Sequence, residues 1–176
     1  MLLKKARSHC RELQDSRTEK NMTRKSSIRD DAGKDKKEAS MEITEIPFAK
    51  TIGLKKSDSG VLELTFGDSL YNHLQTIAAS AQYSLAELAA GDYMQQLFPE
   101  LVGKVLPVLR DSRFKFKSPA QSSISAFPEV SQKAVTKFMQ HFEKKGRALI
   151  VIDVSVKDDE GKVTSSGCFT WYVQSL

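Results

Sequence analysis

The sequence predicts an α+β domain in which an antiparallel sheet packs against one long helix. Residues 74–97 are rich in Ala, Leu, Gln and Glu, which are strong helix formers, and they are expected to form the long helix. Segments before and after it alternate apolar and polar residues with the period of two that is typical of strands. One strand, a long helix and then several strands is the element order of an antiparallel sheet with its helix on one face.

The chain up to the end of the long helix has clear boundaries. A short helical turn is expected at residues 46–53, and a strand at residues 61–66 that ends at Gly67. Within the long helix Gly91 is the one weak position, and Pro99 closes the helical run.

Strands and a second helix follow Pro99. Ser131 can cap this helix, its apolar residues have helical spacing, and Gly146 ends it. A turn at residues 159–161 separates the last two strands, which are therefore expected to pair. The expected elements are strands at residues 114–117 and 122–127, a helix at residues 131–145, and strands at residues 148–156 and 163–173.

Charge divides the chain into two parts. Residues 1–40 hold 12 Lys and Arg against 7 Asp and Glu, whereas the other 136 residues hold 15 of each, so the first part carries the whole net charge of +5. This first part has no aromatic residue and few large apolar ones, so it cannot bury enough surface to offset the entropy of ordering. We expect residues 1–40 to be a disordered basic tail and residues 41–176 to be the single domain.

Several function classes are excluded by composition. The neutral domain has no basic helix or aromatic RNA-binding motif, so no nucleic-acid partner is expected. No run of about 18 apolar residues and no apolar leader is present, so we expect a cytoplasmic protein without a membrane partner. The two cysteines, Cys10 and Cys168, lie in no cluster of metal-ligand spacing, so no metal site is expected. The absence of a glycine-rich phosphate loop argues against nucleotide hydrolysis and hydride transfer.

The long helix carries the chemical signal. Six alanines lie between Gln75 and Gly91, and the helix is apolar over more than one stripe, which is typical of a buried helix. A carboxylate on such a helix costs free energy unless it is paired or used. Polar residues at steps of three or four form a seam down one side of it: Thr76, Ser80, Tyr83, Ser84 and Glu87.

Residues 72–87 resemble the loop and central helix of hotdog-fold acyl-CoA thioesterases, especially those similar to the phenylacetate-pathway enzymes. Those relatives carry an Asn in the loop, small residues at the start of the helix, and an acidic residue two turns later. Here 14 residues separate Asn72 from Glu87, as in that family, and Leu85-Ala86-Glu87 matches the end of the motif. The resemblance covers nearly all of residues 46–174, and the chain also looks like an uncharacterised bacterial branch with an Asn-His loop.

The resemblance implies a hotdog fold, in which the antiparallel sheet wraps around the long central helix, with the helix at residues 131–145 as an addition. It also implies a homodimer, or a dimer of dimers, that hydrolyses an acyl-CoA or related acyl thioester. The thioester carbonyl would accept hydrogen bonds from N–H groups of Ala79 or Ser80 at the helix start. Glu87 would activate a water as general base, or less favourably act as nucleophile, and Asn72 would orient water or carbonyl from a facing loop, expected from the partner subunit.

Coenzyme A would enter only as part of the substrate, and no resident cofactor is implied. Its phosphates need basic neighbours, for which the candidates are Arg113, just before the strand at residues 114–117, and Lys115 and Lys117 on that strand. Alternating lysines on a strand are more often its solvated face, and that alternative stays open.

Two function classes remain after this comparison of motifs. Ala78-Ala79-Ser80 replaces the His-Gly-Gly of many relatives, and the added methyl groups favour a non-catalytic domain that binds acyl-CoA or only dimerises. The retained Asn72 and Glu87 favour the enzyme. Dehydratase or isomerase chemistry is a third option that the lack of a histidine on the helix disfavours. Without catalysis, Glu87 would be satisfied by Tyr83 or by a partner-chain donor, and Asn72 would hold a turn or cap the helix.

Overall fold

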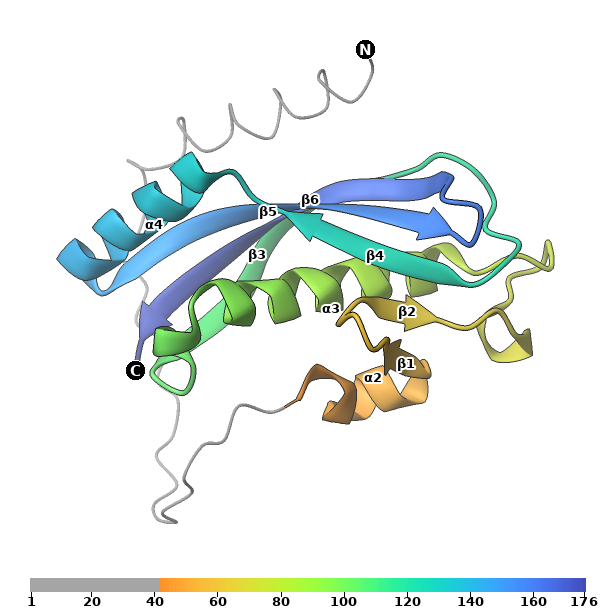
Figure 1. Ribbon diagram of the computed structural model, residues 1–176, viewed down its shortest axis with the longest axis horizontal. Helices are drawn as coiled ribbons and strands as arrows, with labels where there is room; N and C mark the ends of the chain where they lie inside the picture. The colour runs from red at the N-terminus through yellow and green to blue at the C-terminus, as the bar shows by residue number, and fades with distance from the viewer. Residues whose placement is uncertain (1–41) are drawn as a thin grey trace. The chain divides into compact units, whose positions relative to one another are not determined.

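A six-stranded antiparallel sheet organises the chain, in the strand order β1-β2-β4-β5-β6-β3 (Figure 1). The computed structural model describes residues 42–176, so the tail predicted over residues 1–40 lies outside the described residues and stays a prediction. The strands are β1 Leu54–Lys56, β2 Leu62–Leu64, β3 Val105–Phe116, β4 Ile124–Glu129, β5 Arg147–Asp158 and β6 Val163–Ser175. The helices are α2 Pro47–Thr51, α3 Ala79–Leu97 and α4 Gln132–Lys145, with short 3-10 turns η1 Ile43–Glu45, η2 Asp68–Leu70 and η3 Pro99–Leu101.

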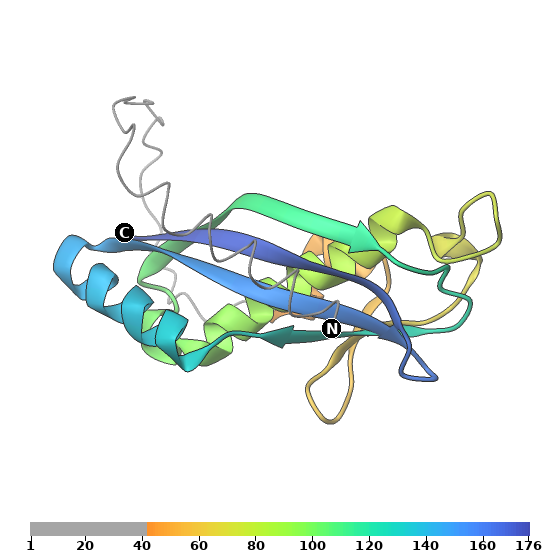
Figure 2. The ribbon, with the colours of Figure 1, turned by 90° about the horizontal axis from the view of Figure 1, so that it is seen from above.

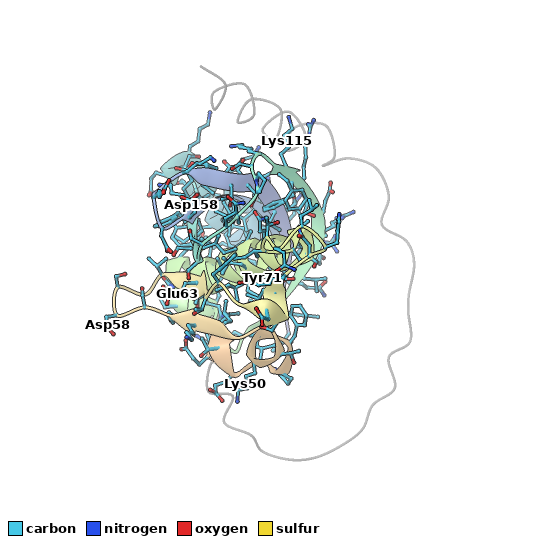
Figure 3. The ribbon with its side chains drawn as sticks, turned by 90° about the vertical axis from the view of Figure 1, so that its right-hand side faces the viewer. Lys50, Asp58, Glu63, Tyr71, Lys115 and Asp158 are labelled. Atoms are coloured by element: carbon cyan, nitrogen blue, oxygen red, sulfur yellow. The ribbon has the colours of Figure 1, made fainter. Side chains whose placement is uncertain are left out.

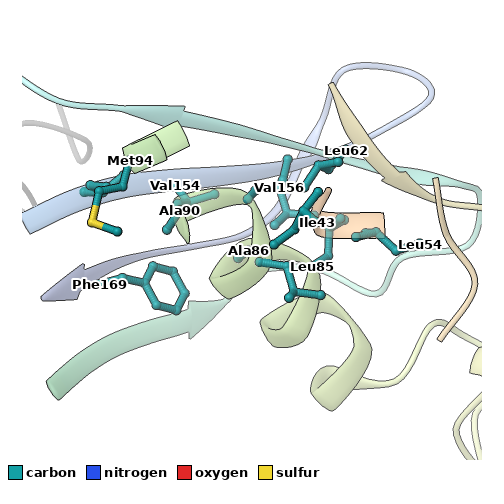
Figure 4. Packing of buried hydrophobic residues seen from close by; sticks show 14 of the residues in the cluster. Ile43, Leu54, Leu62, Leu85, Ala86, Ala90, Met94, Val154, Val156 and Phe169 are labelled. Carbon is teal, nitrogen blue, oxygen red and sulfur yellow. The ribbon is translucent and has the colours of Figure 1, made fainter. Parts of the chain in front are cut away.

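The long helix α3 packs against one face of this sheet, which confirms the predicted α+β class (Figure 4). Side chains of β5 alternate with a period of two, so that Ile150, Ile152, Val154 and Val156 are buried toward the helix. Gly91 lies against the ring of Trp171, which a Cβ atom there would meet at a contact distance of 3.4 Å. Small residues on α3 therefore allow the helix to approach the sheet closely.

The start of α3 differs from the prediction. The helix begins at Ala79 and not at residue 74, because Asn72 offers the following backbone an alternative set of hydrogen bonds. Its Oδ1 accepts from the N–H groups of Leu74 and Thr76, at 2.8 and 3.3 Å. Gln75 has φ of 58°, in the left-handed region, which is incompatible with a continuing right-handed helix.

Two strands also differ from the prediction. β1 is a three-residue strand that no alternation in the sequence marks, and β3 is 12 residues long rather than the four expected at residues 114–117. β3 lies at the edge of the sheet and, among the described strands, pairs only with β6, so Pro107 interrupts no central ladder. Its register shifts between Leu109 and Asp111, which leaves Arg110 as the extra residue of a β-bulge.

The second helix, α4, has the predicted ends. Ser131 Oγ accepts a hydrogen bond from the N–H of Ala134 at 3.3 Å, and Gly146 ends the helix with φ of 63°. α4 packs on β5 near the end of the sheet where α3 finishes, and the rings of Phe98 and Phe138 lie 4.5 Å apart (Figure 2). α4 therefore covers the end of the core opposite to the start of α3.

No helix within residues 42–176 is both long enough and apolar enough to cross a lipid bilayer.

Candidate active site

Glu87 lies two turns into α3 and is half-buried. Burial raises the pKa of its carboxyl above the ordinary value of a glutamate. Within residues 42–176 no hydrogen bond or ion pair reaches this carboxylate. The hydroxyl of Tyr83, one of the partners expected if Glu87 were merely structural, is instead bonded to Ser112 Oγ at 2.7 Å.

The start of α3 supplies the donors that the sequence predicts. The first bond along the helix runs from the N–H of Gln82 to the carbonyl of Ala78 at 3.1 Å, so the N–H groups of Ala79 and Ser80 precede the helical ladder. Neither N–H has an acceptor among the described residues, and both residues are exposed. The helix dipole favours negative charge at this end, so these groups can bind an oxyanion.

One copy of α3 does not bring these groups together. Ala79 and Glu87 are eight positions apart on the helix, which corresponds to roughly 12 Å along its axis. A general base must lie within hydrogen-bond reach of the water it activates. A carbonyl bound at Ala79 therefore needs a base that is not Glu87 of the same helix. Glu87 in turn can act only on a carbonyl bound by some other group.

Asn72 holds its own loop. Its Oδ1 accepts from two backbone N–H groups, as described above. Its Nδ2 donates to Thr76 Oγ1 at 2.9 Å, and its backbone N–H donates to the carbonyl of Thr76 at 2.9 Å. These bonds make a rigid loop that places His73 and Leu74 at its exposed tip. One hydrogen of Nδ2 remains for another acceptor.

An aromatic cluster that the sequence analysis did not identify fills the space between α3 and β3. Tyr83 is the helical member, and its ring centroid lies 5.5 Å from both Phe114 on β3 and Phe169 on β6. Phe116 continues the cluster toward solvent at 5.2 Å from Phe114. No single-sequence signal joins these residues, because α3, β3 and β6 meet only in the folded chain.

Two of the three predicted phosphate contacts face away from α3. Arg113, Lys115 and Lys117 are all exposed. Arg113 and Lys115 alternate with Phe114, which faces α3, so they project from the opposite face of β3. Figure 3 shows Lys115 far from Tyr71, which precedes α3.

Other histidine and acidic side chains show no metal-site arrangement. His141 lies exposed on α4, with Nδ1 2.9 Å from the carbonyl of Lys137. Across residues 42–176 no group of three or more His, Cys, Asp or Glu residues is arranged to hold a metal ion.

Comparisons with known proteins agree with this architecture. A family model described as a domain of unknown function, DUF4442, matches residues 39–173. No curated protein matches the chain.

Solved structures similar to the chain come from several bacteria. A Pseudomonas aeruginosa protein of unknown function, described as a probable thioesterase, is 18% identical with a TM-score of 0.64, covering 76% of this chain and 91% of its own. A Chlorobaculum tepidum protein of unknown function is 21% identical with a TM-score of 0.65, covering 74% and 88%. A Bacillus halodurans protein, solved with CoA, is 17% identical with a TM-score of 0.56, covering 72% and 74%. These similarities show the hotdog fold.

Proposed function

Since the chain belongs to the DUF4442 family and has the hotdog fold, we propose that it is a homodimeric hydrolase of an acyl-CoA or related acyl thioester. The observation that carries the proposal is the half-buried carboxylate of Glu87, unpaired within residues 42–176, on a helix that begins with unpaired N–H groups. A carboxylate kept in such surroundings costs free energy that packing does not return, which is typical of a group retained for chemistry.

The separation within α3 supports a site shared between two chains. The carbonyl would lie at Ala79 and Ser80 of one protomer, and the base would be Glu87 of the partner subunit. β3 is an edge strand of 12 residues that exposes Leu106 and Val108 at 56% and 46%, and such an edge is a template for a second strand. Pairing of two β3 strands would join the sheets of two chains.

Hydrolysis then follows from the properties of these groups. The carboxylate of Glu87 takes a proton from a water, and the water oxygen adds to the thioester carbonyl carbon. The N–H groups of Ala79 and Ser80 stabilise the oxyanion that forms. When the intermediate collapses, the C–S bond breaks and the proton passes to the leaving sulfur, which gives a carboxylic acid and coenzyme A. Asn72 would use its remaining Nδ2 hydrogen to orient water or carbonyl.

A binding domain is the second candidate, and the side chains of Ala79 and Ser80 favour it. Where relatives have glycine at these two positions the backbone is open, whereas each side chain here restricts the approach of the thioester. Such a domain would bind acyl-CoA at the same helix terminus without hydrolysing it.

Release of free thiol from a panel of acyl-CoA esters of different chain length and shape separates the two candidates. The hydrolase should release thiol from at least one ester at a rate proportional to protein concentration. Calorimetric titration with a non-hydrolysable acyl-CoA thioether should be run in parallel. Binding of the thioether without thiol release from any ester would establish the binding domain and reject the hydrolase.

A further inference from the structure

The β-bulge in β3 decides which residues of this strand face α3. In a regular strand, residues three apart point to opposite faces. Leu109 packs against the core and pairs with Trp171, whereas Ser112 pairs with Phe169 and its hydroxyl reaches Tyr83. The extra residue, Arg110, therefore turns Ser112 to the helix side of the sheet.

Ser112 and Tyr83 form a direct polar link between the helix and the edge strand. Their hydroxyl oxygens are 2.7 Å apart, and both residues are partly buried. The Tyr83 ring makes an edge contact with Phe114, two residues beyond Ser112, at an interplanar angle of 79°. The hydroxyl is thus held at the end of a ring that is itself fixed by packing.

The backbone of α3 contacts β2, β4, β5 and β6 most closely, and its links to β3 are made mainly by long side chains. Glu87 is one helical turn after Tyr83, so both side chains emerge on the same flank of α3. The position of this flank relative to β3 therefore depends on the Tyr83 contacts. β3 is also the strand at which the second chain would join.

We propose that Tyr83 and Ser112 are a positioning pair, whose hydrogen bond fixes the flank of α3 that carries Glu87 against the edge strand β3. The inference rests on the proposed function, in which Glu87 acts on a carbonyl held by the other chain. When a base acts on a carbonyl held by another chain, its activity depends on its distance from that chain. In this proposal the two residues act through the position of Glu87 and not by contact with the thioester.

Removing one oxygen tests the pair. Tyr83→Phe keeps the ring contacts with Phe114 and Phe169 and deletes the hydroxyl. With a positioned base displaced, kcat should fall about tenfold while KM for the acyl-CoA stays within roughly twofold. Ser112→Ala should cause the same loss, and the double variant should lose no more than either single one. Ser112→Thr keeps a hydroxyl at this position and should retain wild-type kcat.

Tyr172→Phe is the matched control. Its hydroxyl donates to Gln174 Oε1 at 2.9 Å, and its neighbours Trp171 and Val173 point inward, so it lies on the other face of the sheet. The same atom is deleted from a hydrogen-bonded tyrosine that does not touch α3. Its kcat should equal that of the wild type.

The outcomes are distinguishable. Wild-type kcat in Tyr83→Phe, or equal losses in Tyr83→Phe and Tyr172→Phe, would overturn the positioning pair and leave the hydrolase intact. Losses of Tyr83→Phe and Ser112→Ala that multiply in the double variant would also overturn it, because the residues would then act separately. A wild-type protein that turns over no ester would reject the hydrolase, and the positioning pair with it.

Discussion

Asp92 and Glu87 lie five residues apart on α3, which places them about 140° apart around the helix axis. Asp92 faces β1, where Lys56 Nζ binds its carboxylate at 3.2 Å and Gln96 Nε2 donates to it at 2.7 Å. Asp92 is the more buried of the two, with 8% of its surface exposed, and it is satisfied. Glu87 is less buried and has no partner within residues 42–176. Burial alone therefore does not distinguish the two carboxylates, whereas the absence of a partner among the described residues does.

The largest effect is expected at Glu87. Glu87→Gln keeps the size of the side chain but cannot accept a proton, so the rate of thiol release should fall by at least ~10²-fold while the oligomeric state stays that of the wild type. Initial rates and size-exclusion chromatography measure the two properties. Glu143→Gln, which makes the same change on the exposed surface of α4, is the control and should change neither property. Unchanged thiol release in Glu87→Gln would remove the catalytic assignment.

Asp92→Asn should show the opposite profile. Loss of the charge weakens the bonds to Lys56 and Gln96, and the free energy of unfolding should fall by about 2 kcal/mol, as measured by urea denaturation. The rate of thiol release per folded molecule should not change. If this variant lost turnover and kept its stability, the chemical side of α3 would be the one that carries Asp92, and Glu87 would be the structural carboxylate.

The pH dependence of kcat/KM should reflect the burial of Glu87. Because burial raises the pKa of its carboxyl, kcat/KM should begin to fall at a pH above the ordinary glutamate value of 4.5 as the solution is acidified.

The same raised pKa makes the stability of the protein depend on pH. The stability that protonated Glu87 contributes is fully present below its unfolded pKa and is lost as the pH rises through its folded pKa. Glu87→Gln should therefore melt higher than the wild type at pH 7, and this difference should disappear at pH 4. A constant difference between pH 4 and pH 7 would contradict this explanation.

The smallest effect is expected on the far face of β3. If Arg113 and Lys115 contact the phosphates of coenzyme A, Lys115→Gln should raise KM for acyl-CoA about threefold at low salt, and the effect should vanish near 1 M salt. A short acyl thioester that lacks the nucleotide should be hydrolysed equally by both proteins. Equal KM values for acyl-CoA at low salt would make these residues part of the solvated face.

Local signals account for what the sequence predicted correctly. Ser131 and Gly146 bound α4 through contacts within a few residues, β5 shows its alternation directly, and β6 follows the turn at residues 159–161 as its partner strand. The predicted start of α3 was wrong because the prediction followed the helix propensity of residues 74–78, whereas in the folded chain the hydrogen bonds of Asn72 hold this segment in a turn. A single sequence does not show which of the two wins.

Contacts between distant segments account for what was missed. Lys56 and Asp92 are 36 residues apart, and Tyr83 and Ser112 are 29 residues apart, so no periodicity connects them. Glu87 could be proposed from the sequence because the spacing from Asn72 is a property of one contiguous segment. Its lack of a partner among the described residues, which separates it from Asp92, became visible only in the folded chain.

Arg110 gives β3 a property that matters when relatives are aligned. If this one residue were deleted, Leu109 and Ser112 would lie two positions apart, and a regular strand would place both on the face that packs against α3. Deletion would therefore remove the bulge and straighten β3 without exchanging its two faces. A relative with a one-residue gap at this place in an alignment can keep the Tyr83 link. A relative that has the extra residue but pairs without a bulge cannot, because Ser112 and Phe114 would then turn to the other face.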